Sequence, residues 1–401
     1  MTMPIKTLLV STLYPSSVRP IHGIFVETRL RELLKSGAVE TKVVAPVPWF
    51  PFSGDRFGEY GQYAATPHYE LRNGIEVHHP RYLHLPKVGM NRAPRALAKA
   101  ILPIARKLIA DGFDFDLIDA HYYYPDGVAA GLVARALGKP FVVTARGTDL
   151  NLIPQYAYPR QLILETAMHA SASIGVCRAL MDSLAELGAA KEKLHVFRNG
   201  VDLERFVPEA RDQARQRLAL KAGGMQLLSV GHLIERKGHH IAIEAMPLLP
   251  PDVTLNIVGS GPERNALEQL AATLGVGDRV FFAGQRPQEE LKWWYGAADV
   301  LLLCSSREGW ANVLLEAMAC GTPVVATNIW GTPEVVSVPA AGRLMHERSA
   351  AGLADALQAL LRDYPERVDI RRHAEAFSWT QTTQDQLDLF GKILMLEEVV
   401  A

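Results

Sequence analysis

The sequence predicts an α/β protein made of two doubly wound, Rossmann-like domains. Short apolar runs followed by a glycine-containing turn and then by helical spacing recur along the chain, and this order is typical of parallel sheets covered by helices. The pattern begins at residues 6–10 and restarts at residues 226–230. The chain has 401 residues, which is more than one hydrophobic core normally supports. We therefore expect two sheets that face each other across a cleft.

Charge and composition exclude several classes of function. The formal net charge of -1 argues against a nucleic-acid binder driven by electrostatics. Cys177, Cys304 and Cys320 lie in apolar surroundings without a CxxC motif, which favours reduced core thiols in a cytoplasmic protein. The sequence shows no secretory signal and no apolar stretch of membrane-spanning length.

The first domain begins with a strand at residues 6–10, a long loop at 14–25 and a helix at 23–35. Gly23 at the helix start would let the backbone approach a donor phosphate or sugar, although a glycine needed only for the turn fits equally well. After a strand at 42–45, the proline and aromatic residues 46–54 cannot continue the sheet and are expected to meet an acceptor or a membrane. Asn73-Gly74 predicts a hairpin between residues 69–71 and 75–78.

Residues 87–107 alternate basic and apolar side chains. This pattern predicts an amphipathic helix. Such a helix either docks on an anionic membrane or is a solvated face over a core stripe, and both interpretations stay open.

Two polar residues follow strands of this domain. His121 ends the strand at 115–120, where ligands bind in open α/β sheets. Arg146 follows the strand at 141–144, and it could clamp a phosphate or an acidic sugar or bridge Asp149. Asp114 and Asp116 form an Asp-x-Asp, but it precedes a strand instead of following one, so we interpret it as local turn chemistry and assign no metal.

The second domain repeats the order of strand, glycine-containing turn and helix. Gly231 follows the strand at 226–230, and Arg236 and Lys237 come just before a helix, an arrangement that suits a diphosphate. Gly259 follows the strand at 255–258. The third glycine of a dinucleotide fingerprint is replaced by Arg264, which counts against a dehydrogenase.

Residues 307–334 carry the strongest signal. Residues 313–319 are apolar on every side except at Glu316, so the helix is expected to be buried and its carboxylate to hold a partner. Residues Gly309 to Asn312 would lie at the helix N-terminus, where free amides favour anionic or hydroxyl-rich ligands, and Glu308 would lie at the rim. An internal Arg or Lys paired with Glu316 is the alternative.

The Glu308–Glu316 spacing, followed by AMACGTPVVAT and a Gly-x-Pro-Glu, resembles the signature of glycosyltransferase family 4. The resemblance implies the GT-B fold, with a nucleotide-sugar-binding domain at 199–376, an acceptor-side domain at 1–198 and a C-terminal helix at 377–401 that crosses back to it. It implies that Glu316 takes the ribose hydroxyls, that Lys237 with Arg236 takes the diphosphate and that Glu308 takes the sugar. His121 would face the reaction centre. The donor-binding residues would be Gly23, Arg146, Gly231, Gly259, Gly309, Trp310, Ala311, Asn312, Val313 and Glu316.

The sequence departs from the family pattern at three places. Arg146 stands where relatives often have histidine, His232 stands where arginine is common, and Trp310-Ala311 replaces Phe-Gly. The expected function is a retaining, metal-independent and cofactor-free transfer of sugar from a nucleoside-diphosphate sugar to a glycan or lipid-linked acceptor at the cytoplasmic face of the inner membrane. A nucleotide-sugar epimerase and a non-catalytic nucleotide-sugar-binding component of a membrane assembly are the alternatives.

Overall fold

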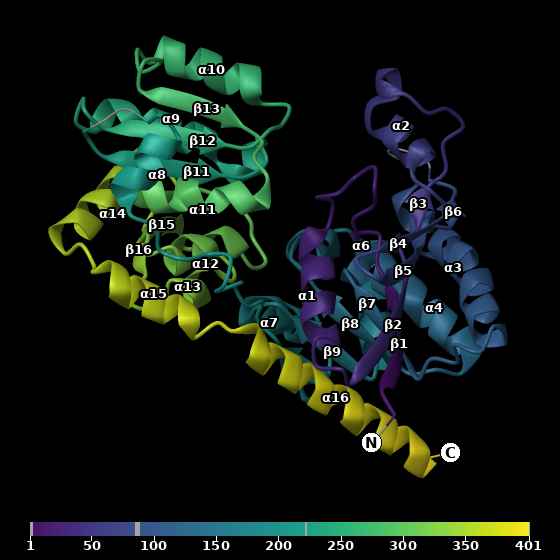
Figure 1. Ribbon diagram of the computed structural model, residues 1–401. Helices are drawn as coiled ribbons and strands as arrows, with labels where there is room; N and C mark the ends of the chain where they lie inside the picture. Colours follow the sequence, from purple (N-terminus) through teal and green to yellow (C-terminus); the bar gives the residue numbers. More distant parts are fainter. Residues whose placement is uncertain (1–2, 85–88, 221–222, 401) are drawn as a thin grey trace. The chain divides into compact units, whose positions relative to one another are not determined.

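The computed structural model describes residues 3–84, 89–220 and 223–400, with side chains through residue 396 (Figure 1). Contacts divide the chain into two compact units. Unit 1 holds the residues up to Arg198 and those from Thr380 onward, and unit 2 holds Asn199–Trp379. Each unit is a mostly parallel sheet covered by helices, so the predicted two-domain α/β fold is confirmed.

The sheet of unit 1 has eight strands in the order β10-β9-β8-β7-β1-β2-β5-β4. All neighbours run parallel except β4 and β5. The strands are β1 Ile5–Val10, β2 Val39–Val44, β4 Tyr69–Arg72, β5 Ile75–His78, β7 Leu117–His121, β8 Phe141–Ala145, β9 Ala172–Gly175 and β10 Leu194–Val196. The central strands β1 and β7 therefore end side by side, and they bring Ser11 next to His121.

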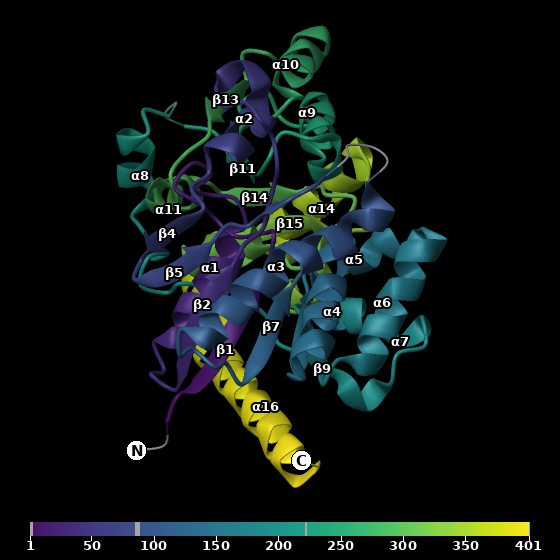
Figure 2. The same ribbon diagram turned by 90° about the vertical axis from the view of Figure 1, so that its right-hand side faces the viewer.

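The helices of unit 1 cover both faces of this sheet (Figures 1 and 2). They are α1 Ile24–Leu34, α2 Gly58–Ala65, α3 Ala93–Ala110, α4 Val128–Leu137, α5 Thr148–Asn151, α6 Ala157–His169, α7 Arg178–Glu186 and, from Thr380, α16 Trp379–Val400. Leu33 of α1 and Leu389, Phe390 and Ile393 of α16 share one core cluster with strands β7, β8 and β9. The C-terminal helix thus packs on unit 1.

The hairpin prediction is confirmed, because β4 and β5 pair antiparallel across Asn73 and Gly74, both with positive φ. Residues 46–54 do not continue the eight-stranded sheet, as predicted. Val47–Pro48 forms β3, which pairs with β6 Arg81–Tyr82 in a separate two-stranded sheet. Proline is tolerated there because an edge strand needs few amide donors.

The predicted basic helix corresponds to α3, although Lys87 lies outside the described residues. Its apolar residues Leu97, Ile101 and Leu108 are buried in unit 1 itself, while Arg95 and Lys99 are exposed. The apolar stripe is therefore core, and only the charged face is available to a membrane.

Unit 2 holds a six-stranded parallel sheet in the order β13-β12-β11-β14-β15-β16. Its strands are β11 Gln226–Val230, β12 Thr254–Val258, β13 Val280–Gly284, β14 Val300–Leu303, β15 Val324–Thr327 and β16 Gly342–Met345. Its helices are α8 Arg211–Arg217, α9 His239–Ala245, α10 Arg264–Thr273, α11 Gln288–Ala297, α12 Asn312–Ala319, α13 Thr332–Val335, α14 Ala350–Arg362 and α15 Arg367–Glu375.

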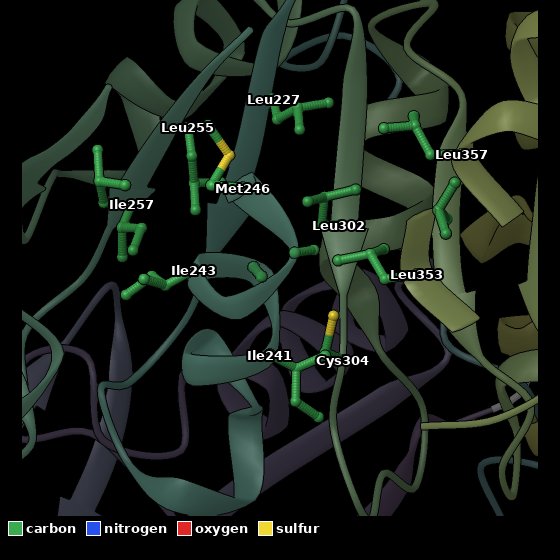
Figure 3. Close-up of a cluster of buried hydrophobic side chains, with 14 of the residues drawn as sticks. Leu227, Ile241, Ile243, Met246, Leu255, Ile257, Leu302, Cys304, Leu353 and Leu357 are labelled. Carbon is green, nitrogen blue, oxygen red and sulfur yellow. The ribbon is translucent and has the colours of Figure 1, made fainter. Parts of the chain in front are cut away.

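The main core of unit 2 lies between the sheet and helices α9, α10 and α14. Leu255 and Ile257 of β12 face Ile243 and Met246 from the α9 segment, as Figure 3 shows. Alternate residues of each strand enter this core, which fixes the register and hence the places where the strands end. The three cysteines are buried and free, as predicted. Among the residues described, no helix combines the length and apolarity that crossing a bilayer requires.

Candidate active site

The strand ends of unit 2 carry the predicted phosphate-binding turn. Gly231 follows β11 and Gly259 follows β12, with φ of 158° and 150°. A Cβ on Gly259 would lie 1.8 Å from the carbonyl oxygen of Gly231. The two turns therefore pack backbone against backbone, which only glycine at position 259 allows.

Lys237 and Arg236 converge on Glu308. Both belong to a single 3-10 turn, Glu235–Lys237, shortly after β11, whereas Glu308 follows β14. The Lys237 ammonium lies 2.6 Å from one carboxylate oxygen of Glu308, and the Arg236 guanidinium lies 3.6 Å from the other. Ser305 donates a further hydrogen bond of 2.7 Å to the carboxylate. Sequence analysis placed Glu308 at the rim of the site, but the side chain is only 9 % exposed.

The charge state of Glu308 follows from these contacts. Burial by itself would raise the pKa of the carboxyl, but Lys237 and then Arg236 outweigh it and hold the pKa below its ordinary value. Glu308 is therefore a carboxylate at neutral pH. It holds the two cations side by side.

Residues Gly309 to Asn312 lead into α12 as predicted. Ala311 directly precedes the helix and Asn312 is its first residue. Trp310 is buried against Phe377, with 5.8 Å between ring centroids. Asn312 accepts a hydrogen bond of 3.2 Å from Asn199. The chain therefore enters the helix along a fixed path that brings the amides of residues 310–312 to its positive end, and partly buried Val313 continues the helix.

Glu316 lies in the second turn of α12, where its partner is the Tyr295 hydroxyl at 2.7 Å. Among the residues that the structure describes, no Arg or Lys is bound directly to Glu316, so the alternative of an internal ion pair is not supported. Burial raises the pKa of Glu316, and the Tyr295 hydroxyl and Arg205 act in the opposite direction. The carboxylate is half-buried and retains acceptor capacity beyond the Tyr295 bond.

In unit 1, His121 ends β7 and is buried, with 1 % of its surface exposed. Its Nε2 lies 3.3 Å from Asp119, and Arg146 contacts its Nδ1. Because a guanidinium only donates, Nδ1 accepts and the ring proton sits on Nε2. Burial lowers the pKa of His121 to about 4, with Asp119 opposing this shift and Arg146 adding to it. The ring is therefore neutral at physiological pH.

The guanidinium of Arg146 contacts His121, and its backbone amide donates to Asp149. The Asp149 carboxylate accepts backbone amides of Tyr123, Arg146 and Gly147. It thus organises the loop after β8, because a carboxylate readily takes several amide donors at a helix start. The binding of a phosphate or an acidic sugar by Arg146 stays a prediction.

Two other expectations concern loops of unit 1. A Cβ on Gly23 would lie 2.3 Å from the Leu13 carbonyl, and its φ is 67°. Packing therefore explains this glycine, and its contact with a donor stays a prediction. Asp114 pairs with Lys139, and Asp116 accepts the Lys6 amide. Both partners are distant in sequence, so the Asp-x-Asp joins separate segments and is not the local turn chemistry that we expected.

Two models of known protein families match the chain, one in each half. The model described as "Glycosyltransferase Family 4" matches residues 25–205, and the model "Glycosyl transferases group 1" matches residues 210–377. A D-inositol 3-phosphate glycosyltransferase of Catenulispora acidiphila is 32% identical, covering 88% of this chain and 90% of that protein. The chain belongs to glycosyltransferase family 4. A second member, TuaC of Bacillus subtilis, named for teichuronic acid biosynthesis, is 30% identical, covering 88% of each chain.

Solved structures of glycosyltransferases share the fold. Sucrose-phosphate synthase from Thermosynechococcus elongatus superposes with a TM-score of 0.78 at 22% identity, covering 98% of this chain and 100% of that one. HepE of Anabaena in complex with UDP gives 0.72 at 21% identity, covering 97% and 100%. Both carry the GT-B fold that the resemblance implies, and this family 4 member is accordingly a transferase.

Several residues of this glycosyltransferase site were missed by sequence reasoning. Ser305 and Tyr295 hold the two glutamates, and neither carries a motif that marks it in advance. Asp119 could have been found, because it stands two residues before His121 in one strand and so points to the same side. The structure brings Lys237, Arg236 and Glu308 together in unit 2, and it brings His121 and Arg146 together in unit 1.

Proposed function

We propose that this chain is a retaining, metal-independent glycosyltransferase that moves a sugar from a nucleoside-diphosphate sugar to a hydroxyl of a glycan or lipid-linked acceptor. The observation that carries the proposal is the convergence of Lys237 and Arg236 on Glu308 at adjacent strand ends of unit 2. Two fixed cations beside a helix N-terminus form a site for a group that bears two negative charges.

Lys237 is the principal ligand of the diphosphate in this proposal. Its ammonium has three N–H groups, and Glu308 takes one of them. The others can donate to phosphate oxygens while Glu308 holds the side chain in place. Because the negative charge on the departing diphosphate grows in the transition state, a preorganised cation lowers the barrier and does not only bind the ground state.

The carboxylates act as binders in this mechanism. Glu316 accepts hydrogen bonds from the ribose hydroxyls. Glu308 accepts hydrogen bonds from hydroxyls of the sugar, and the amides of residues 310–312 donate hydrogen bonds to it. Glu308 is engaged by Lys237, Arg236 and Ser305, so its charge is neutralised and it is a poor nucleophile. An oxygen of the leaving diphosphate takes the proton of the acceptor hydroxyl, with retention of configuration and with the two side-chain cations in place of a metal.

Relatives support the class of substrate. HepE structures contain UDP or UDP-glucose, and TuaC is named for teichuronic acid biosynthesis. These names favour a nucleotide-sugar donor and a place in polysaccharide or glycoconjugate biosynthesis.

A donor screen tests the proposal. Thermal unfolding is measured with UDP, GDP, ADP and their sugars, and one nucleotide is expected to raise the melting temperature, since saturation at 100 times Kd adds about 2.7 kcal/mol. The matching sugar donor is then incubated with acceptors in EDTA, and NMR reads the anomeric configuration of the product. An inverted product or a requirement for metal would overturn the mechanism. Conversion of the donor without any acceptor would favour the epimerase.

In unit 1, we assign acceptor positioning to the His121–Arg146 pair. His121→Ala is expected to lower kcat by about tenfold or more, because small misplacements of reacting groups cost rate. Donor affinity is expected to change much less, since the proposed diphosphate and ribose ligands Lys237, Arg236 and Glu316 lie in unit 2. Calorimetry and initial rates check both parts, and an unchanged kcat would remove the assignment.

Unit 1 also offers a surface for an anionic membrane. Trp49 and Phe52 are 54% and 56% exposed, and Leu83 lines a surface hollow together with Arg92, Arg95 and Lys99 of the α3 segment. The Trp49 amide donates to the carbonyl of Tyr82, which lines the same hollow. Exposed aromatic and basic side chains on one unit suit the interface of an anionic bilayer.

Vesicle binding tests this surface. Arg95→Glu with Lys99→Glu is expected to weaken co-sedimentation with phosphatidylglycerol vesicles by at least about tenfold, since each basic residue contributes about 1 kcal/mol. Arg160→Glu on α6 is the matched control and should bind like wild type. Equal binding of wild type and the double variant, or no preference over phosphatidylcholine, would contradict membrane contact through α3.

A further inference from the structure

His121 is the end of a buried chain of polar side chains that reaches the C-terminal helix. The Nε2 of Gln386 in α16 donates a hydrogen bond of 3.1 Å to Oδ2 of Asp119. The same Oδ2 atom faces His121. Arg29 of α1 donates from Nε to the Gln386 carbonyl oxygen at 3.1 Å. The order is therefore Arg29, Gln386, Asp119, His121, Arg146, and all five belong to unit 1.

Arg29 and Arg146 lie at the two ends of this hydrogen-bonded row, and their chemistry fixes the position of each shared proton. Arg29 and Arg146 only donate, and an ionised Asp119 only accepts. The Gln386 amide must therefore present its oxygen to Arg29 and its nitrogen to Asp119, and His121 must carry its proton on Nε2. A residue at 386 has to accept on one side and donate on the other, which leucine cannot do and an ionised glutamate can do on one side only.

This row of hydrogen-bonded side chains is also buried. Arg29, Asp119, His121 and Gln386 are each at most 2% exposed. Water cannot replace a lost hydrogen bond there without rearrangement, and buried polar groups without partners are costly. Arg29 is anchored a second time, through a hydrogen bond of 3.2 Å to the Phe197 carbonyl.

We infer that Gln386 and Arg29 are positioning residues, which hold Asp119 in place and so set the orientation of His121 for acceptor transfer. The C-terminal helix then supplies a group needed for the reaction, in addition to its packing on unit 1. The inference rests on the proposed role of His121. Asp119 keeps a pKa below its ordinary value, where burial opposes and His121, Arg29 and Arg146 favour the carboxylate.

Two substitutions at residue 386 separate positioning from packing. Gln386→Leu removes both hydrogen bonds and is expected to lower kcat by about 10- to 100-fold with donor Kd unchanged. Gln386→Glu keeps the acceptor for Arg29 but places a second carboxyl against Asp119. When that carboxyl is protonated it donates as the amide did, so Gln386→Glu activity should approach wild type near pH 6 and fall by pH 8.5. The charged groups around this pair are Arg29, Arg146, His121 and Asp385, and they are the same in both variants. Gln386→Leu should show no such recovery.

Gln384→Leu is the matched control, because Gln384 lies on the same helix but is exposed and bonds only Asp388 among the described residues. It should behave as wild type. Independently of turnover, ¹⁵N NMR of labelled histidine should show the Nε2–H tautomer of His121 in both the wild type and Gln386→Leu, because Arg146 still donates to Nδ1. The Nε2 signal should shift in Gln386→Leu, because Asp119 is no longer held by residue 386. A wild-type Nδ1–H tautomer would overturn the inference. So would an unchanged Nε2 signal of His121, kcat and pH profile in all variants, even if the enzyme transfers sugar as proposed.

Discussion

Lys237→Ala is expected to lower kcat by at least about 100-fold, the usual effect of removing one preorganised donor that faces growing negative charge. KM for the donor should rise less, because Arg236 and the amides at the start of α12 still bind the diphosphate. Steady-state rates with the donor identified by the thermal screen check the expectation. Unchanged kinetics would remove the diphosphate role of Lys237.

The structure also shows what must be controlled in this experiment. Lys237 is the closest ion-pair partner of Glu308 at 2.6 Å, so its removal leaves a buried carboxylate with weaker compensation and lowers stability. Lys237→Gln keeps an N–H for Glu308 and removes the charge, and the same rate loss with a smaller shift of the melting temperature is expected. Lys292→Ala is a control within unit 2, because it removes a lysine whose ion pair is with Glu209 and not with Glu308.

Glu316→Ala is expected to weaken nucleoside-diphosphate binding by about 100-fold or more. A carboxylate that accepts two ribose hydroxyls makes two hydrogen bonds to a charged group, each of about 1.5–3 kcal/mol, and 1.4 kcal/mol corresponds to a factor of ten. Isothermal titration calorimetry with the nucleoside diphosphate measures the change. Equal affinities would remove the ribose assignment.

Tyr295→Phe is the comparison variant for Glu316. It deletes the 2.7 Å hydrogen bond but keeps the carboxylate. Because this bond lowers the pKa of Glu316 against the effect of burial, its loss should raise that pKa further. Affinity of Tyr295→Phe should then fall more at pH 5.5 than at pH 8, since the carboxyl is protonated at the lower pH. If Tyr295→Phe and Glu316→Ala were equally weak at both values, loss of local packing would explain the effect instead of the carboxylate.

Much of the fold could be predicted because it follows from local pattern. The apolar runs, the glycine turns and the helical spacing repeat in both halves, and the structure has a parallel sheet at each place. Asn73-Gly74 specified its hairpin through backbone preference alone. Residues 46–54 leave the main sheet as predicted, but strand β3 could not be foreseen, because a two-residue strand with an edge proline depends on a partner that is distant in sequence.

The sequence by itself determined which residues are candidates for the chemistry of this glycosyltransferase. The glutamates, the Arg236-Lys237 pair and the strand-end histidine are marked by their positions relative to strands and helices, and those positions are local. Only the tertiary structure decided what each one contacts. Lys237 meets Glu308, 71 residues away, and Gln386 meets Asp119, 267 residues away. The reason is that such contacts depend on strand order and on the path of the C-terminal helix, which packing of the whole chain selects and no short pattern contains.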